Sequence, residues 1–157
     1  MITAESNAPR EGPVPLTHTD VIVERIQAPI ARVWAVVSDH GSIGSYVERV
    51  VVNRVEGRGV GAVRYIANPD GELRERLETL DSQTHSLSYS VVDPSPLTMT
   101  HYLGIVQLAP EGDGACRIMW SGRFATGSTP DPRAQKAGLE QFYRGAIAGL
   151  QSLLAKP

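Results

Sequence analysis

The first candidates for a functional site are one acidic and one basic residue on the apolar face of a predicted hairpin. Two stretches, 60–67 and 72–80, alternate like β-strands and are joined by the turn sequence Asn-Pro-Asp-Gly. In the second stretch the face formed by positions 74, 76 and 78 is fully charged and must meet water. Glu75 therefore points inward on the opposite face, and the same alternation turns Arg64 of the first stretch inward.

Antiparallel pairing of these two strands brings Arg64 and Glu75 together. They lie directly opposite each other or one position off register, depending on whether the turn carries a bulge. Because a buried charge without a partner is costly, we expect an ion pair. The pair either fixes the strand register or places one of its members against a ligand carbonyl or hydroxyl. In the second case Arg64 would stabilise an enolate and Glu75 would move protons.

Aromatic side chains share the predicted inner face. Alternation turns Tyr89 inward from one strand, and Trp120 and Phe124 inward from another. These residues either pack the core or orient a polar ligand group, since a buried Trp N–H or Tyr O–H needs a partner.

For the predicted strand at 97–108, the residue pattern does not decide which of the two faces points inward. We favour the face of Tyr102 as the inner one, because Gly104 on the same face would leave room for it. His101 belongs to the other face. If it points inward it is a candidate acid or base near neutral pH; otherwise it lies on the outer surface.

The elements that would position these residues follow a simple order: one strand, two short helices, six consecutive strands and a long helix. Consecutive strands joined by short turns imply an antiparallel sheet. The expected strands are 20–26, 47–55, 60–67, 72–80, 86–92, 97–108 and 116–125, with short helices from Pro29 and at 42–46, and the long helix from Pro132.

The long helix carries one apolar stripe, formed by Leu139, Phe142, Tyr143, Ala146, Ile147, Leu150, Leu153 and Leu154. One helix covers only part of a seven-stranded sheet, so we expect the sheet to curve around it. Gly138, Gly145 and Gly149 form a strip beside Phe142. They allow either a close approach of helix to sheet or space for a ligand.

Length and composition restrict the classes of partner and cofactor that the chain is expected to have. The 157 residues fit one domain at 18–157, after an extended or disordered tail at 1–17. A net charge of −2 without a basic block argues against nucleic acid, and no apolar run is long enough for a membrane span. The single cysteine, Cys116, reads as a core residue of a cytoplasmic protein. The spacing of Cys and His suits no metal site, and no nucleotide-binding loop is present, so we expect no cofactor.

Several short motifs, in this order, resemble the polyketide cyclase/dehydrase branch of the Bet v 1-like, START-related (SRPBCC) proteins. The match runs over about 20–154. The residues that carry it are Ala28-Pro29, Val33-Trp34, Asp39, Gly61-Ala62-Val63-Arg64, Asp70-Gly71, Glu75, Leu77, Asp81, Tyr89 and Trp120-Ser121-Gly122-Arg123-Phe124. The resemblance implies an α+β helix-grip fold with a ligand cavity but fixes no reaction.

Three functions fit such a fold. The chain is a cyclase- or dehydratase-like enzyme acting on an apolar or aromatic molecule, a non-catalytic small-molecule or lipid carrier, or a protein-interaction module. It would act as a monomer or homodimer. The predicted catalytic residues are Arg64, Glu75, Tyr102 and His101, and the predicted ligand-binding residues are Tyr46, Ile66, Leu77, Tyr89, Trp120, Phe124 and Phe142.

Overall fold

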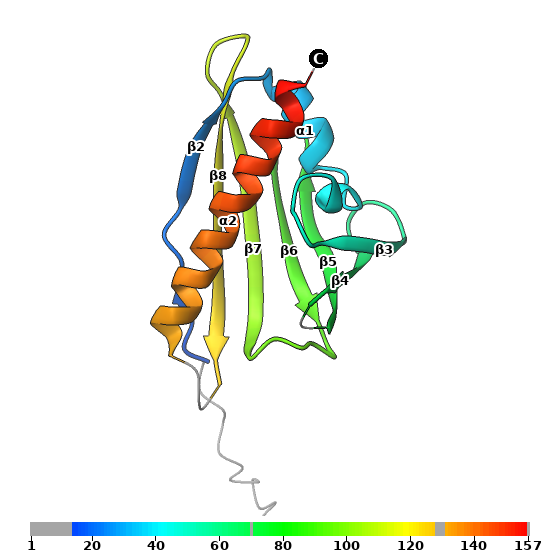
Figure 1. Cartoon of the computed structure of the whole chain (residues 1–157), viewed down its shortest axis with the longest axis vertical. Helices are drawn as coiled ribbons and strands as arrows, with labels where there is room; N and C mark the ends of the chain where they lie inside the picture. Colours follow the sequence, from blue (N-terminus) through cyan, green and yellow to red (C-terminus); the bar gives the residue numbers. More distant parts are fainter. Residues whose placement is uncertain (1–13, 70, 128–130, 157) are drawn as a thin grey trace, which may run out of the picture.

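The computed structural model describes residues 14–69, 71–127 and 131–156. A curved antiparallel sheet forms one layer, and a long helix lies across its concave face (Figure 1). The strands are β1 (Thr17–His18), β2 (Ile22–Ile26), β3 (Val51–Glu56), β4 (Val63–Asn68), β5 (Gly71–Asp81), β6 (Ser86–Val92), β7 (Met99–Pro110) and β8 (Cys116–Thr126). The helices are α1 (Ile30–Val37), the 3₁₀ turn η1 (Ser42–Ser45) and α2 (Pro132–Ala155). This is the predicted helix-grip fold.

The sheet has eight strands in the order β1-β8-β7-β6-β5-β4-β3, and β2 also pairs with β8. The strand expected at 20–26 is β2, and a short strand that was not expected, β1, precedes it on the same partner. Between them the Thr19 amide donates to the Gly122 carbonyl at 2.9 Å, and the Gly122 amide donates to Thr19 Oγ1 at 3.0 Å. A side-chain oxygen replaces one ladder acceptor here, which interrupts the strand without separating it from β8.

Two other strands, β3 and β4, begin three or more residues later than the sequence predicts. Residues 47–50, expected in a strand, form a loop in which Arg49 has a φ of 65°. β4 begins at Val63 because Gly57, Gly59 and Gly61 before it all have positive φ, a conformation open mainly to glycine.

The helix α2 begins where its sequence predicts. Asp131 caps it by accepting a hydrogen bond from the Arg133 amide at 2.9 Å, and Pro132 occupies the first turn. Its buried face, which includes Tyr143, Ile147 and Leu150, packs on the concave side of the sheet. No helix in the described part of the chain is long and apolar enough to cross a membrane.

Candidate functional site

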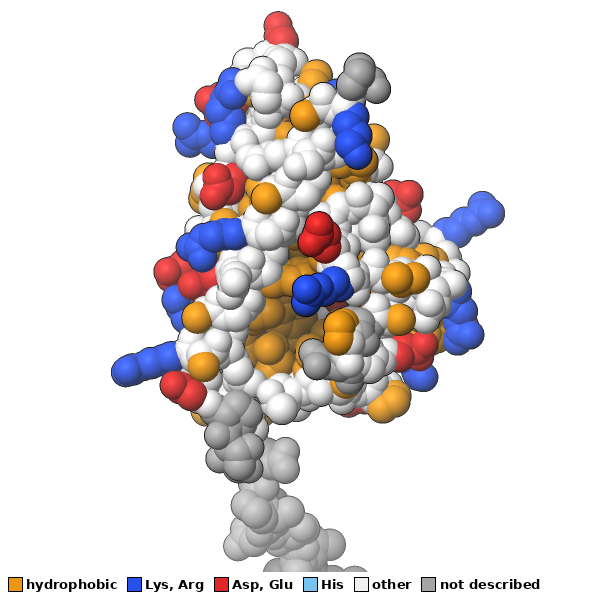
Figure 2. All heavy atoms as spheres, viewed as in Figure 1, with side chains coloured by type: hydrophobic (Ala, Val, Ile, Leu, Met, Phe, Trp, Pro, Cys, Tyr) orange, Lys and Arg blue, Asp and Glu red, His pale blue; other side chains and the backbone are white. Residues whose placement is uncertain are grey.

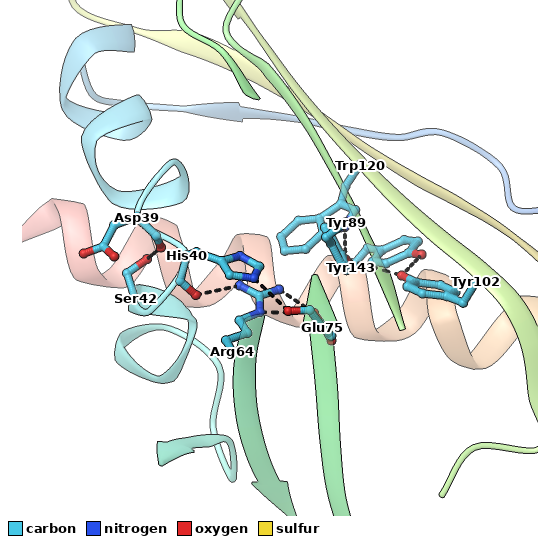
Figure 3. Close-up of polar contacts among 9 residues, drawn as sticks. All are labelled: Asp39, His40, Ser42, Arg64, Glu75, Tyr89, Tyr102, Trp120 and Tyr143. Carbon is cyan, nitrogen blue, oxygen red and sulfur yellow. Dashed lines mark hydrogen bonds and ion pairs between the residues drawn. The ribbon is translucent and has the colours of Figure 1, made fainter. Parts of the chain in front are cut away.

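A buried ion pair joins β4 and β5. Arg64 lies directly opposite Glu75 in the strand register, as the tight-turn alternative predicts. The guanidinium donates through Nε at 3.1 Å and Nη2 at 2.6 Å to the same carboxylate oxygen, Oε2 (Figure 3). The two side chains are only 6% and 9% exposed. The predicted inward orientation of both residues is confirmed; their role stays a prediction.

His40 closes this cluster from the turn between α1 and η1. Arg64 Nη1 donates to the His40 carbonyl oxygen at 3.2 Å, so each guanidinium nitrogen has an acceptor. The His40 ring reaches back, with Nε2 2.9 Å from the Glu75 carbonyl oxygen. A neutral imidazole protonated at Nε2 satisfies that contact.

Charge and burial set the protonation states in this cluster. Burial alone would lower the pKa of Arg64, but the Glu75 carboxylate beside it outweighs that effect and raises it. Burial lowers the pKa of His40, and the positive charge of Arg64 lowers it further. The cluster therefore holds a guanidinium and a neutral imidazole at neutral pH.

A chain of phenols lies beside the ion pair on the same concave face. The Trp120 Nε1–H donates to the Tyr89 hydroxyl at 3.0 Å. That hydroxyl is 3.3 Å from the Tyr102 hydroxyl, which is 2.6 Å from the hydroxyl of Tyr143 on α2 (Figure 3). The Arg64 Cζ lies 5.1 Å from the centroid of the Tyr89 ring, which links the two groups.

Two glycines make room for the phenols. Gly104 and Gly122 face each other in the β7–β8 register. A Cβ on Gly104 would overlap the ring of Tyr89, and a Cβ on Gly122 would overlap the hydroxyl of Tyr143. The expectation that Gly104 leaves room on the inner face is correct, and Tyr102 points inward, 7% exposed.

The phenols are neutral. Burial raises the pKa of Tyr89, Tyr102 and Tyr143 above the ordinary range, and raises the pKa of Tyr46 to about 12. At neutral pH these hydroxyls therefore donate and accept hydrogen bonds and carry no charge.

The space between these groups is small. The inner cavity is lined by Val37, Ser38, His40, Tyr46, Arg64, Leu77, Leu87, Tyr89, Val106 and Trp120, and has a volume of about 10 Å³. This is close to the ~10–15 Å³ that one water needs. Side chains thus fill most of the space where the resemblance implies a ligand cavity.

A wider groove lies on the other side of Tyr46. It has a volume of about 390 Å³ and is lined by Tyr46, Val47, Glu48, Phe142, Gly145, Ala146, Ala148, Gly149 and Ser152. Tyr46 lines both spaces and is therefore their common wall. Figure 2 shows the molecule hollowed beside α2, with hydrophobic side chains on the floor of the hollow.

The glycines of α2 do not all have the same role: one allows a close contact with the neighbouring loop, and the others border open space. A Cβ on Gly149 would overlap the carbonyl oxygen of Tyr46, so helix and loop touch there. A Cβ on Gly145 or Gly138 would meet nothing within 4 Å, and Gly145 lines the groove. Close approach applies at one end of the strip and open space at the other.

The remaining predicted residues fall into three groups. Ile66, Leu77 and Phe124 are buried in the core. Phe142 is 37% exposed at the groove, with its ring centroid 6.4 Å from that of Trp120. The inward alternative for His101 is wrong. His101 lies exposed, because its neighbour Tyr102 takes the inner side, and its ring contacts the Thr100 hydroxyl at 3.0 Å.

Sequence reasoning missed two members of the site. Tyr143 stood in the apolar stripe of α2, where its hydroxyl was the only side-chain polar group and could have been noticed. His40 contacts the pair through its own carbonyl, which accepts from Arg64, and through its ring, which meets the Glu75 carbonyl. Side-chain patterns give no signal for such contacts, because the acceptor in each is a backbone carbonyl. Among residues 14–69, 71–127 and 131–156, no group of three or more His, Cys, Asp or Glu side chains could hold a metal ion.

Residues 18–155 match the protein family described as "Polyketide cyclase / dehydrase and lipid transport". A stretch of 95 residues is 33% identical to the abscisic acid receptor PYL6 of Arabidopsis thaliana. That match covers 50% of this chain and 44% of the receptor, so less than half of the receptor is spanned.

Solved structures agree on the fold. An uncharacterised protein from Bacillus thuringiensis superposes with a TM-score of 0.75 at 24% identity, over 89% of this chain and 100% of that one. A point mutant of norcoclaurine synthase from Thalictrum flavum, in complex with a transition-state analogue, superposes with a TM-score of 0.71 at 14% identity, over 93% and 98%. Together with the matched family, these neighbours indicate a ligand-binding fold.

Proposed function

The chain belongs to the polyketide cyclase/dehydrase and lipid transport family of Bet v 1-like proteins, and on that basis we propose that it binds a small apolar or aromatic molecule beside α2. The apolar body of the ligand occupies the groove between Phe142 and Tyr46. One polar group of the ligand is directed toward the buried cluster of Arg64, Glu75 and Tyr89.

The observation that carries this proposal is the position of Tyr46 as the common wall of two unlike spaces. On one side lies a groove of about 390 Å³ with walls that include Phe142 and Ala146. On the other lies a cavity of about 10 Å³ whose lining combines apolar side chains with the polar groups of Arg64, His40 and Tyr89. An apolar wall with a few convergent polar groups is the usual composition of a small-molecule site. In this proposal, movement of Tyr46 joins the two spaces.

Cyclisation or dehydration of the bound molecule is the second candidate. Neutral phenol donors next to a guanidinium, in a site with little water, are suited to polarising a carbonyl and stabilising an enolate. Tyr89, 5.1 Å from Arg64 by its ring centroid, is the phenol best placed for this. The buried tyrosines hold their protons tightly, which favours binding of a carbonyl over proton removal by these groups.

Native mass spectrometry of the protein purified from its host tests both candidates. We expect a stoichiometric small molecule that can be extracted and identified. When the isolated compound is returned to the stripped protein, an unchanged mass together with an unchanged chromatographic retention time indicates a carrier. An isomer of the same mass at a new retention time indicates a cyclase. A product lighter by one water indicates a dehydratase.

The same preparation allows a matched comparison of variants. Phe142→Ala removes an aromatic wall of the groove, and about 1.5–3 kcal/mol of apolar burial is lost with a side chain of this size. We expect the affinity for the neutral dye Nile red to fall about tenfold or more. Val23→Ala, on the exposed outer side of β2, is the control and should leave the affinity unchanged. Equal dye binding by both variants would place the ligand elsewhere.

A further inference from the structure

The inner end of the proposed site has no charge left to offer a ligand. The guanidinium of Arg64 is neutralised by Glu75 at 2.6 Å, and both side chains are buried. His40 beside them and the three phenols nearby are neutral. A carboxylate placed here would gain no unpaired cation and would lie close to the Glu75 carboxylate, which repels it.

Hydrogen-bond donors, in contrast, are in excess. Tyr89, Tyr102 and Tyr143 carry three O–H groups but make only two hydroxyl–hydroxyl contacts, at 3.3 Å and 2.6 Å. Trp120 adds a group that can only donate, and it uses the Tyr89 oxygen as acceptor. Whichever way the hydrogens point, one of these three O–H groups has no acceptor among these contacts.

Tyr89 is the end of the chain that borders the inner cavity. It lines this cavity together with Arg64 and Trp120, whereas Tyr143 is fully buried against Gly122. An acceptor in the cavity would therefore orient the chain so that Tyr143 donates to Tyr102, Tyr102 to Tyr89, and Tyr89 to the acceptor. Each bond in such a chain polarises the next.

We infer that the ligand presents an uncharged carbonyl oxygen to Tyr89 in the inner cavity and that the site excludes ligands with a carboxylate at that position. The cavity of about 10 Å³ has room for one such oxygen, so the rest of the ligand stays in the groove. This inference rests on the proposed function, since it specifies the class of molecule that the same site takes.

Three naphthalenes of similar shape test the inference by titration calorimetry at pH 7.5: 2-acetylnaphthalene, 2-naphthoate and 2-isopropylnaphthalene. We expect the ketone to bind at least tenfold more tightly than the carboxylate, and more tightly than the hydrocarbon. Naphthoate binding as tightly as the ketone would overturn the inference and leave the proposed function standing. If none of the three bound, the proposed function itself would be contradicted.

Two variants of the chain locate the effect. Tyr89→Phe removes the donor, so the ketone should lose its advantage over the hydrocarbon. Tyr65→Phe is the matched control, because the Tyr65 hydroxyl bonds Glu56 in an exposed pair, and it should keep that advantage. A ketone preference that survives Tyr89→Phe contradicts the assignment of the donor.

Glu75→Gln tests the charge argument by gain of binding. It leaves the Arg64 guanidinium without its counter-charge, so the affinity for naphthoate should rise at least tenfold relative to that for the ketone. No change in this ratio in a variant that folds would show that Glu75 does not exclude anions. The Tyr89 and Tyr65 variants keep the inference testable if the Gln variant does not fold.

Discussion

The intact pair of Arg64 and Glu75 adds little to stability, but the loss of one of its members is costly. Forming it removes two charges from water, so its net contribution to stability is small, but removing one partner leaves the other charge buried and unpaired. The Coulomb attraction at 2.6 Å and the hydrogen bond from Arg64 to the His40 carbonyl hold the pair in one arrangement. Its value to the protein therefore lies in the position and charge balance that it fixes.

We expect Glu75→Ala to lower the free energy of unfolding by about 3–5 kcal/mol, measured by urea denaturation at pH 7. Replacing both partners together, as Arg64→Met with Glu75→Leu, should cost much less than the single change, because no charge remains buried. Glu111→Ala is the control: Glu111 pairs on the surface with Arg117 at 3.0 Å and with Arg25 at 3.3 Å, and its loss should cost far less than the loss of Glu75. A single variant as mild as the control would mean that water reaches the pair.

At this scale the sequence predicted directions well and contacts only in part. Strand alternation turned Glu75 inward because the other face of its strand is charged, and the same alternation placed Arg64 and Tyr89 on the inner face of their own strands. It could not reveal that His40, in a distant turn, lies against the pair. One contact joins the Arg64 side chain to the His40 carbonyl, and the other joins the His40 ring to the Glu75 carbonyl. Alternation also does not show which hydroxyl groups bond to each other, because that depends on the side-chain rotamers of residues on four different elements.

The contact between α2 and the loop after η1 determines the width of the groove. Gly149 of the helix lies against the Tyr46 carbonyl, where a Cβ would overlap it. One turn earlier, at Gly145, the helix surface is free and lines the groove. The helix thus contacts the loop at Gly149 and leaves it apart at Gly145. Tyr46, which lines both the groove and the inner cavity, lies at the point of contact.

Gly149→Ala should disturb this contact. Alanine favours a helix over glycine by about 1 kcal/mol, but here its methyl group must displace the backbone of Tyr46. We expect a net loss of about 1–3 kcal/mol in the free energy of unfolding, together with altered dye binding in the groove. Gly138→Ala is the matched control, because open space surrounds it and only the gain in helix propensity remains. If both variants stabilise the protein, the loop moves away without cost.

Element boundaries show where local sequence stops being informative. The capping Asp131 and the Pro132 that follows it mark the start of α2 correctly, because both act within one turn of the chain. β1 and the break that follows it were missed, since they depend on pairing with β8 and on Thr19 bonding Gly122, more than 100 residues away. Residues 47–50 were expected in a strand, yet they form the loop that borders the groove.

For the molecule as a whole, the sequence predicted the curved sheet around one helix by a simple count, since one helix cannot cover so many strands while they stay flat. It did not predict how full the interior is. Trp120, Tyr89, Tyr102 and Tyr143 fill the concave face, and what remains is about 10 Å³. Residual volume is a small difference between large packed volumes, so a residue list cannot give it.

Packing is also uneven across the sheet. β8 lies between β7 and the β1–β2 segment, and Cys116, Ile118 and Phe124 on it are fully buried. β3 is an edge strand that pairs only with β4, and most of its side chains are exposed. A region with few buried apolar contacts opens at lower free energy than the core. The edge that carries the loop beside Tyr46 is therefore the part of the sheet best able to move when a ligand enters.

Amide hydrogen exchange measures this difference directly. Amides of β3 that donate to β4 should exchange faster than amides of β8 that donate to β7, by on the order of 100-fold or more, because they open locally while β8 opens only with the whole fold. A bound ligand should slow exchange at 46–50 and in the adjoining turn of α2, and leave β8 tied to the global free energy of unfolding. Equal opening free energies for β3 and β8 would mean that the sheet opens as one unit. Access past Tyr46 would then require opening of the whole fold instead of movement of its edge.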